Sequence, residues 1–314
     1  MADVAQELSI VVPVRNREAL LQRCLASIIA QTYRPLHVVI VDNDSNDASR
    51  EVARQWAIAN HRSDFRITVV DEPKPGASAA RNRGLREVDT PFVAFFDSDD
   101  TMRPELAEKA MLAFAADEGR EIVAWRVAFH SGRTTTILHA PSRPLMKSQI
   151  FHSALRTHGY AMRTERLLAA GAWRESLPIW NDWELGIRLL LQNPKLMVMR
   201  DVLADVYSHP MSLSGASIET RAPLIIRAIK AAEATLQRSG DKRARKWERL
   251  VNTRRALLAA RLEMEGHTRL ANEIMAEALG HDGINSLRRS LLRFIYFYTR
   301  TGGRGSASML APLL

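Results

Sequence analysis

Short apolar segments alternate with amphipathic ones along the first hundred residues. Residues 8–14 (LSIVVPV) are rich in β-branched side chains and predict a buried strand, and residues 19–29 carry apolar side chains at helical spacing. Further strands are predicted at residues 36–41, 65–70 and 92–96, with helices at residues 48–59 and 78–88. Strands that alternate with helices predict an α/β fold with a Rossmann-like, mostly parallel sheet flanked by helices.

The pattern changes twice further along the chain. Strands are predicted at residues 122–129 and 134–139, and helices at residues 163–170 and 182–191, while residues 147–160 mix helical spacing with aromatic and His residues. From about residue 223 the apolar spacing is almost purely helical. We therefore expect an α/β domain over residues 1–220 and an α-helical C-terminal region over residues 221–314.

The positive charge of the protein is concentrated in that helical region. The whole chain has a net charge of +9, but residues 221–314 hold 18 Lys and Arg against 8 Asp and Glu, whereas residues 1–220 hold 26 against 27. Since no nucleic-acid recognition motif accompanies the basic residues, a nucleic-acid partner is not expected. A basic helical surface also suits a solvated helix face or contact with an anionic membrane.

The cysteine content and the N-terminus bear on location. Cys24 is the single cysteine among 314 residues, so an intrachain disulfide is impossible and an oxidising compartment is not indicated. The first residues lack the pattern of a signal peptide, and no apolar stretch approaches the roughly 18 residues of a membrane span. We expect a cytoplasmic protein, with peripheral attachment to the inner face of the membrane through residues 242–300 as a further expectation.

Acidic residues follow two of the predicted strands directly. Asp42 directly follows the strand at residues 36–41, and Asp97-Ser98-Asp99 follows the strand at residues 92–96. In open α/β sheets, ligands bind beyond the carboxyl ends of the strands. Two carboxylates one residue apart suit Mn²⁺ or Mg²⁺ together with the phosphates of a substrate. A solvated turn is the alternative interpretation of either acidic segment, because Asp and Asn are favoured in turns.

The order and spacing of several motifs resemble family 2 glycosyltransferases. The matching segments are SIVVPVRN, VDNDSND, PGASAARNRGL and AFFDSDD, with weaker matches to about residue 214. The resemblance implies the GT-A fold, a nucleotide-diphosphate sugar as donor, a divalent metal and inversion at the anomeric carbon. It also implies a donor half over about residues 8–110 and an acceptor half over about residues 111–214.

The resemblance assigns residues to the donor site. Asp97 and Asp99 would hold the metal-diphosphate, Asp42 and Asn43 would contact the base, and Arg81 would pair with phosphate. The remaining nucleotide-sugar contacts would be Pro13, Val14, Arg15, Asn16 and Ser98. The base is usually uracil in the family, so a UDP-sugar is expected, but Asn43 stands where relatives carry an acid and leaves the base open.

The same resemblance assigns the chemistry to Asp182 as the general base that takes a proton from the acceptor hydroxyl. Asn181 replaces the acid that relatives carry before it. Two alternatives remain open: Asp182 could simply cap a helix, and Glu184 is a rival base that at i,i+4 spacing would instead pair with Arg188. Trp180 and Trp183 are expected to stack on a sugar of the acceptor, with a place in the core for at least one tryptophan of this region as the alternative.

His209 is the expected third metal ligand, by its place in the family's downstream segment. The acceptor is expected to be a saccharide or a lipid-linked saccharide of the cell envelope. Phe294, Ile295 and Phe297, flanked by arginines, are expected to insert into a membrane, with an oligomer interface as the alternative. Two other functions stay open: a catalytically degenerate scaffold that binds nucleotide or glycan, and a sugar-1-phosphate nucleotidyltransferase, against which the absence of glycine in residues 14–17 argues.

Overall fold

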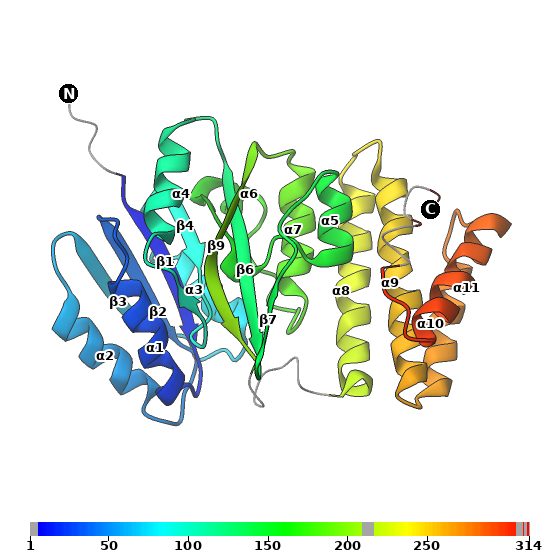
Figure 1. Cartoon of the computed structure of the whole chain (residues 1–314), viewed down its shortest axis with the longest axis horizontal. Coiled ribbons are helices and arrows are strands. Elements are labelled where there is room, and N and C mark those ends of the chain that lie inside the picture. The colour runs from blue at the N-terminus through cyan, green and yellow to red at the C-terminus, as the bar shows by residue number, and fades with distance from the viewer. Residues whose placement is uncertain (1–5, 209–216, 306–309, 311–312, 314) are drawn as a thin grey trace.

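The sheet lies at one end of the molecule and a group of helices at the other, as the computed structural model shows (Figure 1). The structure describes residues 6–208, 217–305, 310 and 313. The chain runs from the sheet into the helices, so the two parts expected from the sequence follow one another along the long axis (Figure 1).

The N-terminal half of the sheet is parallel. Its strands are β1 (Leu8–Val14), β2 (Leu36–Asp42), β3 (Phe65–Asp71) and β4 (Phe92–Phe95). They lie in the order β3-β2-β1-β4, and the pairings between neighbours are parallel. Every residue of β1 and β2 is buried, as expected for strands that helices cover on both faces. The predicted parallel α/β arrangement is confirmed here.

Helices cover both faces of these strands. The helices are α1 (Glu18–Ile29), α2 (Ser49–Asn60), α3 (Ala77–Leu85) and α4 (Leu106–Ala115). Because successive strand residues point to opposite faces, Ile10 packs with α1, α2 and α4, whereas Val11 packs with α3. Helix α3 approaches closely at Gly84, where a Cβ atom would lie 2.4 Å from Val11 Cγ1. A larger residue at position 84 would therefore push α3 away from the sheet.

The second half of the sheet is mixed. Its strands are β5 (Thr101–Met102), β6 (Ile122–Ser131), β7 (Thr134–Ile137), β8 (Tyr160–Arg163) and β9 (Leu196–Tyr207). The order continues β4-β8-β6-β9-β5, with β8 antiparallel to both of its neighbours and β6 parallel to β9. The expectation of a mostly parallel sheet thus holds for the N-terminal half only. The sequence pattern missed β5, β8 and β9, because the first two are short and the third lacks regular apolar alternation.

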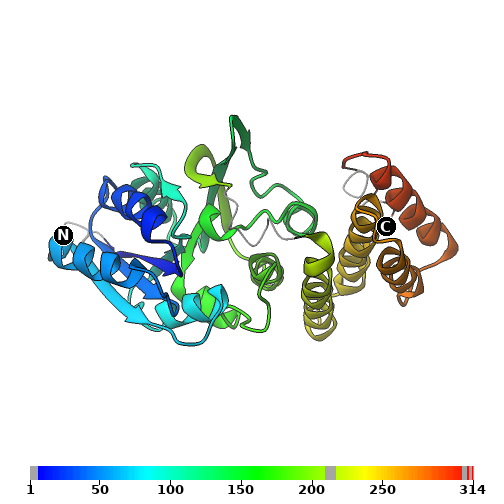
Figure 2. The ribbon, with the colours of Figure 1, turned by 90° about the horizontal axis from the view of Figure 1, so that it is seen from below.

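The remaining helices continue outward from the α3 face. They are α5 (Leu145–His152), α6 (Thr164–Ala169), α7 (Asn181–Leu191), α8 (Ile218–Arg238), α9 (Ala244–Met264), α10 (Thr268–Gly280) and α11 (Ser286–Arg300). Helix α9 contacts α8, α10 and α11, and Figure 2 shows this group beyond α7, away from β1 to β3. The predicted helical C-terminal region is confirmed.

One apolar cluster runs from the sheet through α7 and α8 to α11. The division at residue 220 therefore stays a prediction, because the structure has no break in its core at that place. Within the described residues, no helix is long and apolar enough to cross a membrane.

Candidate active site

The carboxyl ends of β1, β2 and β4 meet at one edge of the sheet, because these strands are parallel neighbours. Asp42 is the last residue of β2, Asn16 follows β1 by two residues, and Asp97 follows β4 by two residues. The residues that the sequence assigned to the donor site therefore gather at a single edge, as the α/β topology predicts.

Asp42 has one engaged and one unengaged carboxylate oxygen. Oδ2 accepts hydrogen bonds from the backbone N–H of Ser45 at 3.2 Å and from Arg50 Nε at 3.1 Å. Oδ1 is buried and has no hydrogen-bond partner in the described part of the chain. A buried acceptor without a donor is costly unless a ligand supplies one, so Asp42 is poised to accept a hydrogen bond from a bound molecule.

Asn43 has a structural role that its residue type explains. Its Nδ2 donates to the carbonyl oxygens of Glu72 and Lys74 at 2.8 and 2.7 Å, and its Oδ1 accepts from Gly76 N–H at 2.8 Å. Gly76 has φ +127°, a conformation that favours glycine. Because the amide both donates and accepts, Asn43 fixes the loop after β3. The expected contact of Asn43 with the nucleotide base stays a prediction beside this structural role.

The segment after β1 places the next predicted residues. Pro13 and Val14 are buried within the sheet, whereas Arg15 is exposed beyond its edge. Asn16 has φ +51°, and its Oδ1 accepts from the backbone N–H of Asn46 at 2.9 Å. The turns after β1 and β2 are thus tied together, and Arg15 is the side chain of this segment that projects outward.

A group of ligand-type side chains lies after β4. Asp97, Asp100 and His158 each place one oxygen or nitrogen within 4.8 Å of the others. Both ring nitrogens of His158 are buried and have no hydrogen-bond partner among the described residues. Asp99 lies outside this group, with Oδ2 3.5 Å from Arg17 Nε. The structure thus groups Asp97 with Asp100 and not with Asp99, while buried Ser98 separates Asp97 from Asp99, and the expected metal role of Asp99 stays a prediction.

The charges in this group are shifted in a way that suits a cation. Burial lowers the pKa of His158 to about 4, so the imidazole is neutral at pH 7. Burial, followed by the charges of Asp97 and Asp99, raises the pKa of Asp100 well above its ordinary value. Burial also acts to raise the pKa of Asp97, but Arg81 and other positive charges outweigh it and the net shift is downward. Asp97 Oδ1 accepts from Arg81, Asp100 Oδ1 accepts from the backbone N–H of Tyr207, and His158 Nδ1 lies 3.4 Å from Asp100 Oδ2. Two carboxyls and a neutral imidazole this close together are a ligand set that fits Mn²⁺ or Mg²⁺.

Arg81 links this group to the start of α7. Its guanidinium is buried, donating to Asp97 Oδ1 at 2.6 Å and to Asn181 Oδ1 at 3.4 Å. Asn181 in turn donates to the carbonyl of Leu177. An acid at position 181 would add a second negative charge beside Arg81, so the amide leaves more of the positive charge of Arg81 available to a ligand.

Asp182 is the second residue of α7, and its Oδ1 accepts the backbone N–H of Trp183 at 2.7 Å. It does not occupy the N-cap position, because the helix begins one residue earlier. Burial raises the pKa of Asp182, and the opposing effects of Arg81, the Trp183 N–H and Arg156 do not cancel that shift. A carboxylate with a raised pKa is a stronger base than an exposed one.

Glu184 is excluded as a rival base. It is fully buried, and Arg188 Nε lies 3.0 Å from each of its carboxylate oxygens. Arg174 makes a further ion pair with it at 3.2 Å. The predicted pairing with Arg188 is confirmed, and both oxygens are committed to holding α7.

The two tryptophans that were assigned to the acceptor differ. Trp183 is fully buried and its Nε1 donates to the carbonyl of Ile150 at 3.1 Å, so the prediction that it stacks on an acceptor sugar is wrong. Trp180 adopts the left-handed conformation with φ +56°, and its ring faces Arg254 of α9, whose Cζ lies 4.5 Å from the ring centroid. Only Trp180 of the pair is placed to contact a ligand.

His209 lies outside the described residues, so its expected metal role stays a prediction. Sequence reasoning missed Asp100 and His158 as potential ligands. Asp100 was visible as the last acid of the Asp97-Ser98-Asp99-Asp100 run, but His158 lies about sixty residues away in the sequence. His158 lies in the short turn before β8, and it reaches this edge because β8 pairs with β4 and β6, which has no sequence signal.

Comparison with known proteins identifies the relatives of the chain. The family model described as "Glycosyl transferase family 2" matches residues 9–170, more than half of the chain. Glycosyltransferase GlyA of Streptococcus pneumoniae serotype 4 is 37% identical over 117 residues, covering 36% of this chain and 16% of that protein. Succinoglycan biosynthesis protein ExoW of Rhizobium meliloti is 38% identical over 117 residues, covering 35% and 36%. The similarity thus spans well under half of each relative.

Solved structures with a similar fold cover nearly the whole chain. Residues 1–349 of S. aureus TarS, in complex with UDP-GlcNAc, have a TM-score of 0.67 at 16% identity, over 95% of this chain and 92% of that one. The mannosyltransferase PcManGT from Pyrobaculum calidifontis, in complex with GDP-Man and Mn²⁺, has a TM-score of 0.58 at 18% identity, over 98% and 85%. At these identities the likeness concerns the fold alone.

Proposed function

The chain belongs to glycosyl transferase family 2 and adopts a GT-A fold, and from this premise we propose that it transfers a sugar from a nucleotide-diphosphate donor to an acceptor hydroxyl with inversion. The observation that carries the proposal is Arg81, which bonds Asp97 in the acidic group and Asn181 beside Asp182. The buried guanidinium of Arg81 therefore lies between the group that we expect to hold the donor phosphates and Asp182, the proposed general base.

We assign the nucleotide base to the buried edge at Asp42. Its unpartnered Oδ1 would accept a ring N–H, which uracil and guanine both offer. A UDP-sugar is the favoured donor, as the family resemblance implies, and the similar structures bind UDP-GlcNAc in one case and GDP-Man in the other. Arg15, exposed beyond the same edge, is placed to reach phosphate or sugar.

Asp97, Asp100 and His158 would hold the divalent metal, with His209 as a further proposed ligand. When bound, Mn²⁺ or Mg²⁺ neutralises the charge that develops on the departing diphosphate. Arg81 adds a fixed positive charge on the same side, and Arg17, 3.5 Å from Asp99, holds that carboxylate at the edge of the group. These residues bind and orient the leaving group.

Asp182 would take the proton of the attacking hydroxyl through Oδ2. Its Oδ1 is held by the Trp183 N–H, and none of the described residues donates a hydrogen bond to Oδ2. Inverting transfer is one displacement, in which the acceptor oxygen bonds to the anomeric carbon as the bond to the diphosphate breaks, and the hydroxyl proton passes to Asp182. Arg81 and Arg156 oppose the rise that burial causes in the pKa of Asp182, without cancelling it.

Thermal unfolding with UDP, GDP, dTDP and CDP, each with Mn²⁺ or with a chelator, tests the proposal. A ligand that binds only the folded state raises the midpoint as its concentration exceeds its dissociation constant. We expect a metal-dependent rise with UDP, absent in Asp97→Asn and retained in Asp201→Asn, a surface carboxylate paired with Lys109. No rise with any nucleotide would contradict the donor site and favour a degenerate scaffold.

We also propose peripheral membrane contact through α11. Leu287, Phe294 and Phe297 are 61%, 51% and 53% exposed. Ile295, which the sequence predicted to insert, is instead fully buried against the helical core. Arginines flank the exposed aromatics along the helix, which suits anionic lipid head groups.

Sedimentation with vesicles tests this contact. The protein should sediment with vesicles that contain anionic lipid, and the double substitution Phe294→Ser with Phe297→Ser should release it. Equal sedimentation of the variant, or a dimer that the substitutions dissociate, would assign the exposed face to another contact.

A further inference from the structure

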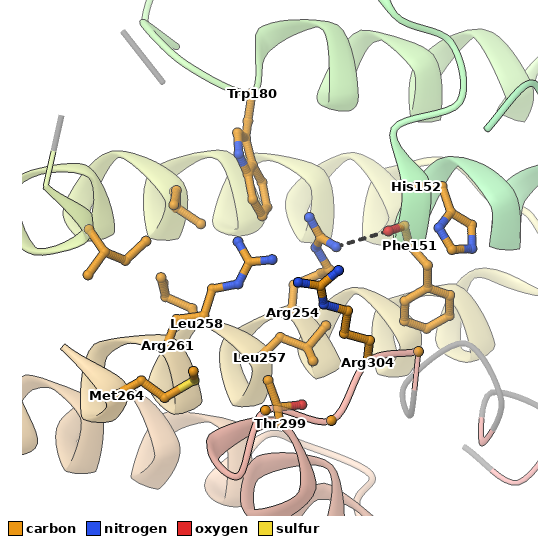
Figure 3. Close-up of a pocket in the computed structure, with 15 residues that line it drawn as sticks. Phe151, His152, Trp180, Arg254, Leu257, Leu258, Arg261, Met264, Thr299 and Arg304 are labelled. Atoms are coloured by element: carbon orange, nitrogen blue, oxygen red, sulfur yellow. Dashed lines mark hydrogen bonds between the residues drawn. The ribbon is translucent and has the colours of Figure 1, made fainter. Parts of the chain in front are cut away.

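A cavity of about 510 Å³ lies between the helices of the catalytic part and those of the C-terminal region. Residues of α5, α8 and α9, Trp180 just before α7, and the segment after α11 line it, and Figure 3 shows the guanidinium groups of Arg254, Arg261 and Arg304 gathered below the Trp180 ring. This volume is in the range of small-molecule sites. Nothing in the proposed donor site uses the cavity.

Arg254 is the most confined of the three arginines. It donates one hydrogen bond, to the carbonyl of Phe151 at 3.2 Å, while its Nε is buried without a partner in the described chain (Figure 3). Burial, and then the charge of Arg261, lower its pKa to about 10, so it is still protonated at pH 7. None of the described residues that line the cavity is acidic. Arg254 as a whole is half-buried, but a guanidinium whose Nε is buried with no acid beside it in the described lining is costly, which points to an anion as the missing partner.

The next residue of the same helix shows what a purely structural arginine looks like in this protein. Arg255 is bound by both carboxylate oxygens of Glu233 on α8, and Glu277 of α10 lies 3.6 Å from its Nε. The chain therefore supplies carboxylates to the arginine that joins its helices. Among the described residues that line the cavity beside α9, it supplies none.

The cavity also has an apolar wall. Leu257, Leu258 and Met264 line it together with Phe151, and the hydroxyl of Thr299 is buried without a hydrogen-bond partner in the described residues. Guanidinium groups bind phosphate oxygens in pairs of hydrogen bonds, and a hydroxyl adds a further donor. The wall suits the carbon skeleton attached to such a phosphate.

We propose that this cavity binds the phosphate group of the acceptor, so that the acceptor is a phosphate-bearing saccharide or lipid. The inference rests on the proposed transferase function. Trp180 connects the cavity with the proposed general base, because it lines the cavity and precedes Asp182 by two residues. The anchored phosphate would place the acceptor beside the start of α7, on the side opposite the donor phosphates.

Calorimetric titration of the full chain with glycerol phosphate, octyl phosphate and octyl glucoside, the last two below their micelle concentrations, tests the proposal. Both phosphates should bind and octyl glucoside should not. Binding should weaken at least tenfold in Arg254→Met, which removes one charge-assisted contact. Arg254→Lys should bind with intermediate affinity, and Arg245→Ala, an exposed arginine of the same helix, should bind like the native protein.

The titration distinguishes a lipid-linked phosphate from a soluble one, and it tests the cavity separately from the donor site. A gain of tenfold or more for octyl phosphate over glycerol phosphate supports a lipid-linked acceptor, and equal affinities support a soluble one. Equal binding in native protein and Arg254→Met, or no binding of either phosphate, overturns the inference. If Arg254→Met lowers the unfolding midpoint without ligand, the exposed cavity residue Arg304 is substituted instead, and Arg304→Ala should likewise weaken phosphate binding. UDP titration with Mn²⁺ in the same samples reports the donor site independently, so either proposal can fail alone.

Discussion

Two regions on either side of the start of α7 differ in the sign of the charges that they gather. At the sheet edge, Asp97 and Asp100 lie beside the neutral imidazole of His158, with Arg81 as the partner of Asp97, whereas in the helical cavity Arg254 and Arg261 lie together without an acid among the described lining residues. The first arrangement suits a cation and the second an anion. A transferase that receives two substrates can distinguish them by this difference, with Asp182 between the two regions.

Removal of the general base, Asp182, should have the largest effect, because it acts on the transfer step in which the substrates of the two regions react. Asp182→Asn should lower the rate of transfer by roughly 10²- to 10⁴-fold, the scale of general base catalysis. The affinity for UDP with Mn²⁺ should not change, because Asp182 does not belong to the acidic group. Steady-state transfer and nucleotide titration check both parts. Transfer at the native rate would remove Asp182 from the mechanism.

The contrast between neighbouring arginines predicts the next largest effect, on stability. Glu233→Gln leaves Arg255 buried beside a neutral group and should lower the free energy of unfolding by about 3 kcal/mol. Denaturant unfolding of the full chain measures this change. Glu273→Gln, which removes an exposed pair with Arg269, should show no measurable loss. If the two variants unfold alike, the matched pair does not hold the helices together.

Substitution of Asp42 tests the proposed contact between the sheet edge and the nucleotide base of the donor. Asp42→Asn keeps the shape but removes the charge that would accept the base N–H, so UDP affinity should fall about tenfold, the scale of a hydrogen bond to a charged group. Titration of UDP against ribose 5-phosphate separates the base from the phosphate contribution, since only UDP binding should weaken. A parallel loss for both ligands would show that Asp42 supports the loop instead of the base.

How much of the molecule the sequence predicts differs between its parts. The strand ends at Asp42 and Asp97 follow from local patterns, because Asp42 ends its strand and Asp97 follows its strand by two residues. The assignment of Asp182 as the general base comes from the resemblance to family 2 glycosyltransferases. The group with His158 depends on an antiparallel strand of four residues, and the cavity depends on how α9 packs on α5 and α8. Such contacts between distant segments leave no periodic signal. The same limit explains why Trp183 was assigned to the surface, since helical spacing does not tell which side of α7 the core covers.

The smallest expected effect is a shift in pH dependence. Asp182 must be ionised to act as a base, and its pKa is raised by burial, so kcat/KM should be constant near neutral pH and fall as pH decreases through that raised pKa, above the ordinary value of about 4. Arg81, the Trp183 N–H and Arg156 each oppose the rise. Arg156→Gln removes one of these charges, which favours the protonated carboxyl and should move the acid limb to higher pH without altering the neutral plateau. An acid limb that stays in place would mean that a group other than Asp182 governs it, and Asp182 would not be the general base.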